Sequence, residues 1–164
     1  MVNSTIHSQR TVARLTVLLV LMMISPLSVA CTVMEFMETT LPFNAPELSN
    51  QDRLRVAEMM IEARKWPGAT IGADVVAGAY VGERNRDRLM DARANDVKSY
   101  LKQLGVDENA IWINKLTFTE DMARNRNGDM DLHQIAIQLV PLCERGCGYL
   151  CNDPRVMPTS NAIR

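Results

Sequence analysis

The segment from Arg86 to Gly105, RDRLMDARANDVKSYLKQLG, carries the strongest structural signal in the chain. Its apolar residues recur at helical spacing, so they form one stripe along a helix that the glycine ends. The members of this stripe are Leu89, Ala94, Val97 and Leu101. Arg93 lies at the edge of the stripe, where its side chain can extend out of the fold toward an anion. Arg93 is therefore the leading candidate functional residue.

The first thirty residues predict a secretory signal peptide, residues 1–30. They contain no Asp or Glu, and Arg10 and Arg14 precede or border an uncharged run from Leu15 to Ile24. A positive start, a short apolar core and a small-residue end are typical of export signals, and this run is too short to span a bilayer. We expect the mature chain to begin at Cys31.

Two cleavage products are compatible with this N-terminus. The sequence Leu27–Cys31 resembles a permissive lipobox, with Ser28 where a Leu is usual, and would leave a diacylated Cys31 that anchors the protein to a membrane. An ordinary signal peptidase would instead cut after Ala30. The position of Cys31 directly behind the apolar segment favours the lipoprotein, and Thr32 behind it favours the outer membrane.

The mature chain is mildly acidic. Removing the signal leaves 16 Lys and Arg against 19 Asp and Glu, a net charge of −3. This balance argues against a nucleic-acid partner, which requires a concentrated basic face. About 134 residues suffice for one domain with one core.

Cysteines cluster near the C-terminus, at Cys143, Cys147 and Cys151. In an exported protein they are better read as disulfide partners than as metal ligands, since no His lies near them. A lipidated Cys31 would leave three thiols, one of them unpaired, whereas a free Cys31 allows two bridges in any of three connectivities. We expect a local bridge that fixes the tail, and no metal or cofactor.

Periodicity along the whole chain predicts six elements, the helix described above included. We expect strands at 33–43, 71–80, 111–118 and 132–140 and helices at 50–65 and 86–105. Ser49 is the expected cap of the first helix, with Asp52 in its first turn. The predicted buried stripe of this helix consists of Leu54, Val56, Ala57, Met60, Ile61 and Ala63. The order implies an α+β fold, a β-α-β-α-β-β sandwich with two helices on one face of a four-stranded mixed sheet.

Three motifs in this order resemble the OmpA-like C-terminal domain family of peptidoglycan-associated proteins, over about residues 33 to 140. The family's helix pattern has Asn, Leu-Ser, Arg-Ala, Val and Leu at fixed spacings. This chain keeps every position except the Asn and the Ser, which are replaced by Arg86 and Met90. The segments Phe43–Leu48 and Gly105–Ile111 are similar to the family's opening turn and to its link into the third strand. The resemblance implies a divergent OmpA-like domain at 31–142, followed by a cysteine-containing tail at 143–164.

Family members hold diaminopimelate of the peptidoglycan stem peptide between two charges. An Asp after the second strand pairs with its ammonium, and the helix arginine pairs with its carboxylate, which a planar guanidinium binds well. Arg93 occupies the arginine position, but Val81 stands where the Asp would be. Glu83 and Asp87 are candidates to replace that acid. Arg93 has a structural alternative, in which it bridges to an acid such as Asp96 or to a loop carbonyl. The resemblance also implies that Tyr80 and Asn85 lie at the rim of the ligand cleft.

These observations predict a binding module and not an enzyme. The chain lacks a nucleophile beside a base, a metal-spaced His pair and a glycine-rich phosphate loop. The leading hypothesis is an exported periplasmic protein, attached to the outer membrane through a lipid on Cys31, that binds peptidoglycan noncovalently. The alternative is a protein-interaction module of an envelope assembly that has lost peptidoglycan binding.

Overall fold

The computed structural model describes residues 30–157 and 160–162, with side chains described for 31–157. The predicted signal peptide lies outside the described residues, apart from the backbone of Ala30. Residues Cys31–Asn161 form one compact unit. The described elements are β1 (Ala30–Thr32), β2 (Glu35–Thr39), α2 (Asn50–Ala63), β3 (Thr70–Tyr80), α3 (Arg86–Gln103), η1 (Glu108–Ala110), β4 (Ile111–Phe118), β5 (Ile135–Leu142), η2 (Gly148–Asn152) and β6 (Ser160–Ala162).

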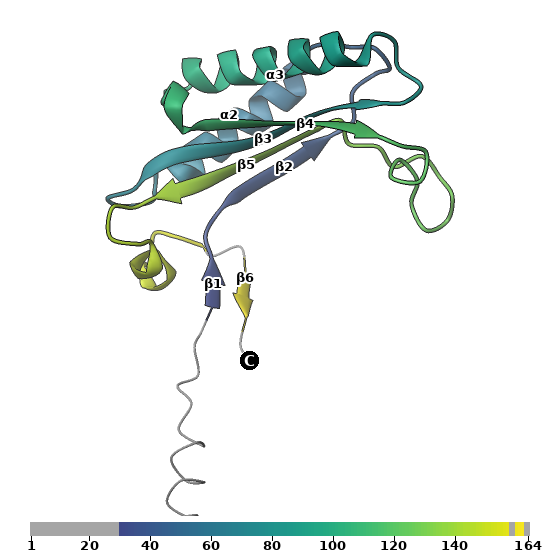
Figure 1. The fold of residues 1–164 in the computed structure, drawn as a ribbon. Coiled ribbons are helices and arrows are strands. Elements are labelled where there is room, and N and C mark those ends of the chain that lie inside the picture. Colours follow the sequence, from purple (N-terminus) through teal and green to yellow (C-terminus); the bar gives the residue numbers. More distant parts are fainter. Residues whose placement is uncertain (1–29, 158–159, 163–164) are drawn as a thin grey trace, which may run out of the picture. The chain divides into compact units, whose positions relative to one another are not determined.

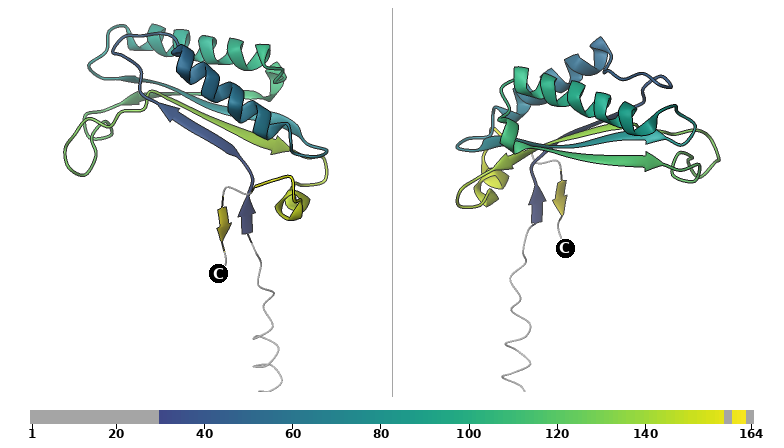
Figure 2. Two further views of the ribbon diagram at one scale, coloured as in Figure 1. Left: turned by 180° about the vertical axis from the view of Figure 1, so that it is seen from behind. Right: turned by 45° about the horizontal axis from the view of Figure 1, so that its top comes forward.

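The main sheet has four strands in the order β2-β5-β3-β4. Strand β5 pairs antiparallel with β2 and β3, and β3 pairs parallel with β4. Helices α2 and α3 both cover the same face of this sheet (Figures 1 and 2). The predicted α+β architecture is therefore confirmed. Strands β1 and β6 form a separate two-stranded sheet, which the sequence did not predict.

Helix α3 is built as its sequence pattern predicts. Its apolar stripe is buried, with Val97 1% and Leu101 0% exposed. The helix ends in a Schellman motif: the N–H of Val106 donates to Leu101 O at 3.0 Å, and that of Gly105 donates to Lys102 O at 3.0 Å. Gly105 can do this because its φ is 94°.

Helix α2 begins at the predicted cap. The Ser49 hydroxyl accepts a hydrogen bond from the Asp52 N–H at 3.1 Å. The predicted stripe is partly wrong, however, because Leu54 and Ile61 are 66% and 56% exposed. Met59 is buried in addition to Met60, so the face toward the sheet is rotated away from Leu54 and Ile61.

Strand ends differ from the predicted ones at β2 and β5. The last strand begins at Ile135 and not at 132. Just before it, the Gln134 carbonyl still accepts the Gly78 N–H at 2.7 Å, and the Gln134 side chain bonds to Leu41. Its amide oxygen accepts from Leu41 N–H at 2.8 Å, and its amide nitrogen donates to Leu41 O at 3.0 Å. Strand β2 runs from Glu35 to Thr39 and is shorter than the predicted strand at 33–43. It ends just before Leu41, whose backbone bonds to the Gln134 side chain.

Of the two disulfides, one lies within the tail and the other ties the tail to the domain. Cys143 pairs with Cys147, the local bridge that was expected, and Cys31 pairs with Cys151 across 120 residues. Leu150 in the predicted tail is completely buried and belongs to the main core. All four cysteines are thus paired in two bridges, one of the three connectivities left open by the sequence.

Candidate functional site

Arg93 does not extend out of the fold. Its side chain has no exposed surface, and the guanidinium points into the space between α3, the end of β3 and the turn after β2. Nε donates to Ala45 O at 2.9 Å, and Nη1 donates to Gly78 O at 2.6 Å. The prediction of an accessible guanidinium at the rim was therefore wrong. The reason is that the short loop after β3 supplies a partner that draws the side chain inward.

That partner is Glu83. Its carboxylate receives Arg93 Nη2 at 2.6 Å and Nη1 at 2.9 Å, the bidentate arrangement that a guanidinium favours. The Glu83 side chain also has no exposed surface. Its oxygens accept two more hydrogen bonds, from the N–H groups of Asn44 and Tyr80, both at 2.8 Å. All four acceptor positions of the carboxylate are thus filled by groups of the same chain.

Burial and hydrogen bonding act in opposite directions on Glu83. Burial raises the pKa of its carboxyl, but the hydrogen bonds from Arg93, Tyr80 and Asn44 together outweigh it and lower the pKa below its ordinary value of 4.5. Glu83 is therefore ionised at neutral pH, and it neutralises the buried Arg93. A buried pair of this kind is stable only when its remaining hydrogen-bonding capacity is satisfied, as it is here.

The local sequence explains how the pair is enclosed. Asn44 adopts a left-handed conformation with φ 61°, and its side-chain oxygen accepts the N–H of Arg84 at 2.7 Å. This contact joins the turn after β2 to the loop that carries Glu83. A side chain at Gly78 would come within 2.1 Å of the Phe118 ring, so only glycine fits where the backbone meets Arg93. The turn at Asn44 and Ala45 was predicted, but its role in holding this pair was not.

Tyr80 contributes its backbone to the pair and its side chain elsewhere. The ring is 6% exposed and makes an edge-to-face contact with Phe43, with centroids 5.7 Å apart. Its hydroxyl donates to Glu120, and this hydrogen bond is the main reason that the pKa of Tyr80 is raised. The ring is therefore packed under the turn and does not present a polar group at an open rim.

Asn85 is the one predicted site residue that the structure separates from the others. It has φ 47° and forms the N-cap of α3, without a capping hydrogen bond from its side chain. With Arg86, Asp87 and Arg88 it lines a shallow hollow of about 390 Å³. Neither Arg93 nor Glu83 lines this hollow. The structure therefore brings Arg93, Glu83 and the Tyr80 backbone together and leaves Asn85 outside.

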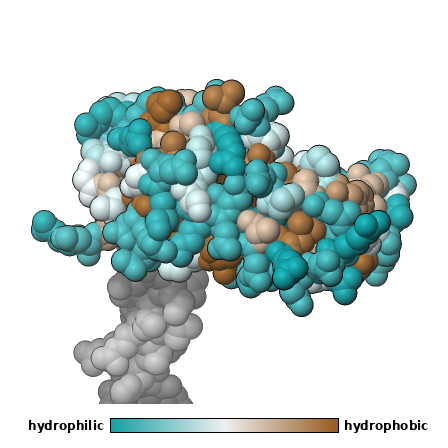
Figure 3. Space-filling model, turned by 90° about the horizontal axis from the view of Figure 1, so that it is seen from above, coloured by the Kyte–Doolittle hydropathy of each residue, from teal (hydrophilic) through white to brown (hydrophobic). Residues whose placement is uncertain are grey.

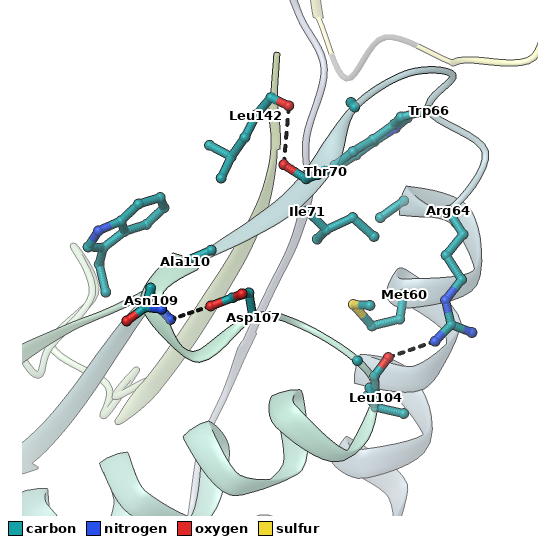
Figure 4. A pocket seen from close by; sticks show the side chains of 14 residues that line it. Met60, Arg64, Trp66, Thr70, Ile71, Leu104, Asp107, Asn109, Ala110 and Leu142 are labelled. Carbon is teal, nitrogen blue, oxygen red and sulfur yellow. Dashed lines mark hydrogen bonds between the residues drawn. The ribbon is translucent and has the colours of Figure 1, made fainter. Parts of the chain in front are cut away.

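A larger hollow of about 640 Å³ lies at the opposite end of β3 (Figure 4). Trp66, Ile71 and Leu142 form part of its apolar wall. Arg64 lies at one side and donates to Leu104 O at 2.6 Å, where it caps the end of α3. No sequence motif pointed to this hollow.

Among the described residues, no group of three or more His, Cys, Asp and Glu side chains is arranged to hold a metal ion. Within the same part of the chain, no helix combines the length and the apolar character needed to cross a membrane.

Comparisons with known proteins give matches in fold only. No protein-family model matches the sequence, and no curated protein matches it. The OmpA-like domain of FopA1 from Francisella tularensis subsp. tularensis SCHU S4 is similar over 80% of this chain and 83% of its own, at 15% identity and a TM-score of 0.47. The C-terminal domain of MotB from Helicobacter pylori is similar over 64% of this chain and 83% of its own, at 14% identity and a TM-score of 0.45. The function has to be inferred from the side chains of this chain itself.

Proposed function

We propose that this chain is an exported, non-enzymatic protein of the cell envelope whose OmpA-like domain serves as a protein-interaction module. The signal-like N-terminus supports export, and the order of elements and the helix pattern around Arg93 support the OmpA-like assignment. The observation that carries the choice of function is the closure of the Arg93–Glu83 pair, in which neither side chain has exposed surface.

Closure of this pair removes the charges that a stem peptide would need. A zwitterionic ligand requires one accessible charge of each sign. Here the guanidinium already holds a carboxylate, and Val81, at the position of the family's acid, cannot pair with an ammonium. Separating a buried ion pair costs roughly 3–5 kcal/mol when one charge is left uncompensated, which disfavours entry of a ligand.

Peptidoglycan binding is the second candidate, and one observation favours it. Glu83 places an acid directly beside the arginine, so the two charges that recognise diaminopimelate are both present. A ligand would have to displace the turn at Asn44 and Ala45 and insert between the two side chains. In that case Glu83 would take the role of the family's Asp.

Sedimentation with purified sacculi distinguishes the two candidates. We expect the wild-type protein to stay in the supernatant with sacculi but to be retained by solubilised envelope proteins freed of peptidoglycan. Arg64→Ala removes an exposed arginine far from the pair and should behave as the wild-type protein does in both assays. Retention of wild-type protein on sacculi, with release by free diaminopimelate, would establish the second candidate and overturn the first.

We also propose that the mature protein carries no lipid on Cys31. The disulfide between Cys31 and Cys151 supports this, because it uses the sulfur that lipidation requires. Mass spectrometry of the mature N-terminal peptide, with and without reduction, tests the proposal. A peptide linked to the one that contains Cys151 is expected, and a diacylglyceryl adduct on Cys31 would refute it.

A further inference from the structure

The edge of the main sheet formed by β4, Ile111–Phe118, has features of an association surface. Strand β4 is the last strand in the order β2-β5-β3-β4, so within the part of the chain that the structure describes only its side toward β3 is paired. The right-hand view of Figure 2 shows this green strand at the front, with no described strand beyond it. An outer strand presents a row of unpaired N–H and C=O groups that can bind another strand.

The two edges of the sheet differ in how they are protected. Strand β2, at the other edge, has five residues and carries Glu35 and Glu38. Short length and charge are the usual means by which an edge is kept from pairing. Strand β4 has eight residues, no Pro or Gly, and one charged residue, Lys115. The β4 edge therefore lacks the protection that β2 has.

Side chains along β4 divide between the two faces of the sheet. Lys115 reaches Asp91 on α3, so the odd-numbered residues face the helices. The even-numbered residues lie on the uncovered face, where Trp112 and Leu116 are 43% and 38% exposed. On the helix side the molecular surface is mainly hydrophilic, with apolar spots between polar side chains (Figure 3). The exposed apolar residues of β4 thus lie beside an open backbone edge.

We propose that β4 pairs antiparallel with β4 of a second copy of this chain, about a two-fold axis at Asn114. In such a pair, residues directly opposite each other must lie on the same face of the joined sheet. An axis at Asn114 places Trp112 of each copy opposite Leu116 of the other. The two Asn114 side-chain amides then lie opposite each other and can form a hydrogen bond. An axis at Lys115 would place two like charges opposite each other, which is destabilising.

The helices leave room for this arrangement. Helix α3 packs mainly against β3 and less against β4. The two β3 strands of the joined sheet would be about 14 Å apart, three strand spacings. This exceeds the diameter of about 10–12 Å of a helix with its side chains, so the two α3 helices can lie side by side. The proposal does not involve the Arg93–Glu83 pair and is independent of the proposed function.

Light scattering coupled to size exclusion tests the association on the mature protein with both disulfides formed. We expect twice the monomer mass. Leu116→Lys puts a charge opposite Trp112 at two symmetric positions and should weaken the dimer roughly tenfold or more. The control is Leu54→Lys, an exposed apolar residue of α2 outside β4, which should leave the dimer unchanged. A monomer at every concentration, or a dimer insensitive to Leu116→Lys, overturns the proposal.

Cysteine cross-linking tests the register. Asn114→Cys would place two thiols beside the axis, with Cα atoms about 4.5–5.5 Å apart, within reach of a disulfide. Thr117→Cys would be roughly 20 Å from its own copy and should not cross-link. We therefore expect a covalent dimer only for Asn114→Cys, identified by mass spectrometry of the linked peptides. Cross-linking of Thr117→Cys in place of Asn114→Cys overturns the register and with it the proposal.

Discussion

Two of the ion pairs that tie helix α3 to the rest of the domain lie in opposite environments. At the end of β3, Arg93 and Glu83 have no exposed side-chain surface. At the β4 edge, the side chains of Lys115 and Asp91 are 48% and 55% exposed. Both unite a cation with a carboxylate, yet only the first is removed from water. We expect burial, and not the pairing itself, to decide how much such a contact contributes to the stability of the fold.

Backbone groups add to the importance of the buried pair. Glu83 accepts the N–H groups of Asn44 and Tyr80, and Arg93 donates to the carbonyls of Ala45 and Gly78. Each of these buried groups would lose a partner if the pair were removed, at a cost of about 1–3 kcal/mol for each unsatisfied group. At the exposed pair on the β4 edge, water can replace the hydrogen bonds that either side chain loses.

The largest expected effect is that of Glu83→Ala. It leaves the Arg93 guanidinium buried without a counter-charge, so the free energy of unfolding should fall by roughly 3–5 kcal/mol. Urea unfolding followed by circular dichroism measures this change. The matched control is Asp91→Ala, which removes a carboxylate from the exposed pair and should cost less than about 1 kcal/mol. Equal effects of the two substitutions would show that burial does not separate the two regions.

Acid provides a second way to open the buried pair. The pKa of Glu83 is lowered in the folded state, so its contribution to stability is fully present above its unfolded pKa of about 4.5 and is lost as pH falls through the folded value. Glu108 also titrates in acid, because hydrogen bonds from Lys102 and Lys98 lower its pKa to about 2. Glu108 is present in both wild type and Glu83→Gln. The difference between their urea midpoints, measured from pH 7 down to pH 3, therefore isolates the part due to Glu83. The two proteins should converge in stability as the pH falls, and a constant difference would contradict the prediction.

Sequence periodicity predicted the architecture well because each helix has to bury an apolar face. Val97 and Leu101 lie on the sheet as expected, and Gly105 ends α3. The same pattern could not decide between the two roles left open for Arg93, a ligand contact and a structural bridge to an acid or a loop carbonyl. The sequence pattern of a charged residue beside an apolar stripe is the same whether its side chain lies in solvent or binds a buried acid. Its burial depends on Glu83, ten residues earlier, and on how a short loop folds against it.

The site also depends on backbone groups, which side-chain identities do not specify. The carbonyls of Ala45 and Gly78 bind Arg93, and no residue type marks a carbonyl that will point inward. The long disulfide was equally hidden, because four cysteines allow three pairings and spacing cannot choose among them. Sequence therefore predicted the elements and the residues nearest the site but not the closed state of the site.

Arg53 and Asp96 form a pair of intermediate exposure, with 27% and 14% of their side chains accessible. Arg53 also lies over the Tyr100 ring at 5.0 Å, and Asp96 accepts the N–H of Leu48 at 2.9 Å. We expect Arg53→Ala to lower the free energy of unfolding by about 1 kcal/mol, between the effects of the buried and the exposed pair. Urea unfolding in low and in high salt gives the measurement. A loss as large as that of Glu83→Ala would mean that partial burial suffices to make a pair essential.

The smallest effect on stability is expected for Lys115→Ala. Both side chains of its ion pair with Asp91 are exposed to solvent, so the free energy of unfolding should change by less than about 0.5 kcal/mol. The same substitution removes the only charged side chain of β4, whose repulsion disfavours registers centred on that residue. Lys115→Ala should therefore leave unfolding in urea unchanged while it lets the cross-linking of single cysteines spread from position 114 to neighbouring registers. Unchanged cross-linking would show that the lysine does not select the register. A large loss of stability would show that the edge contributes to the fold as the buried pair does.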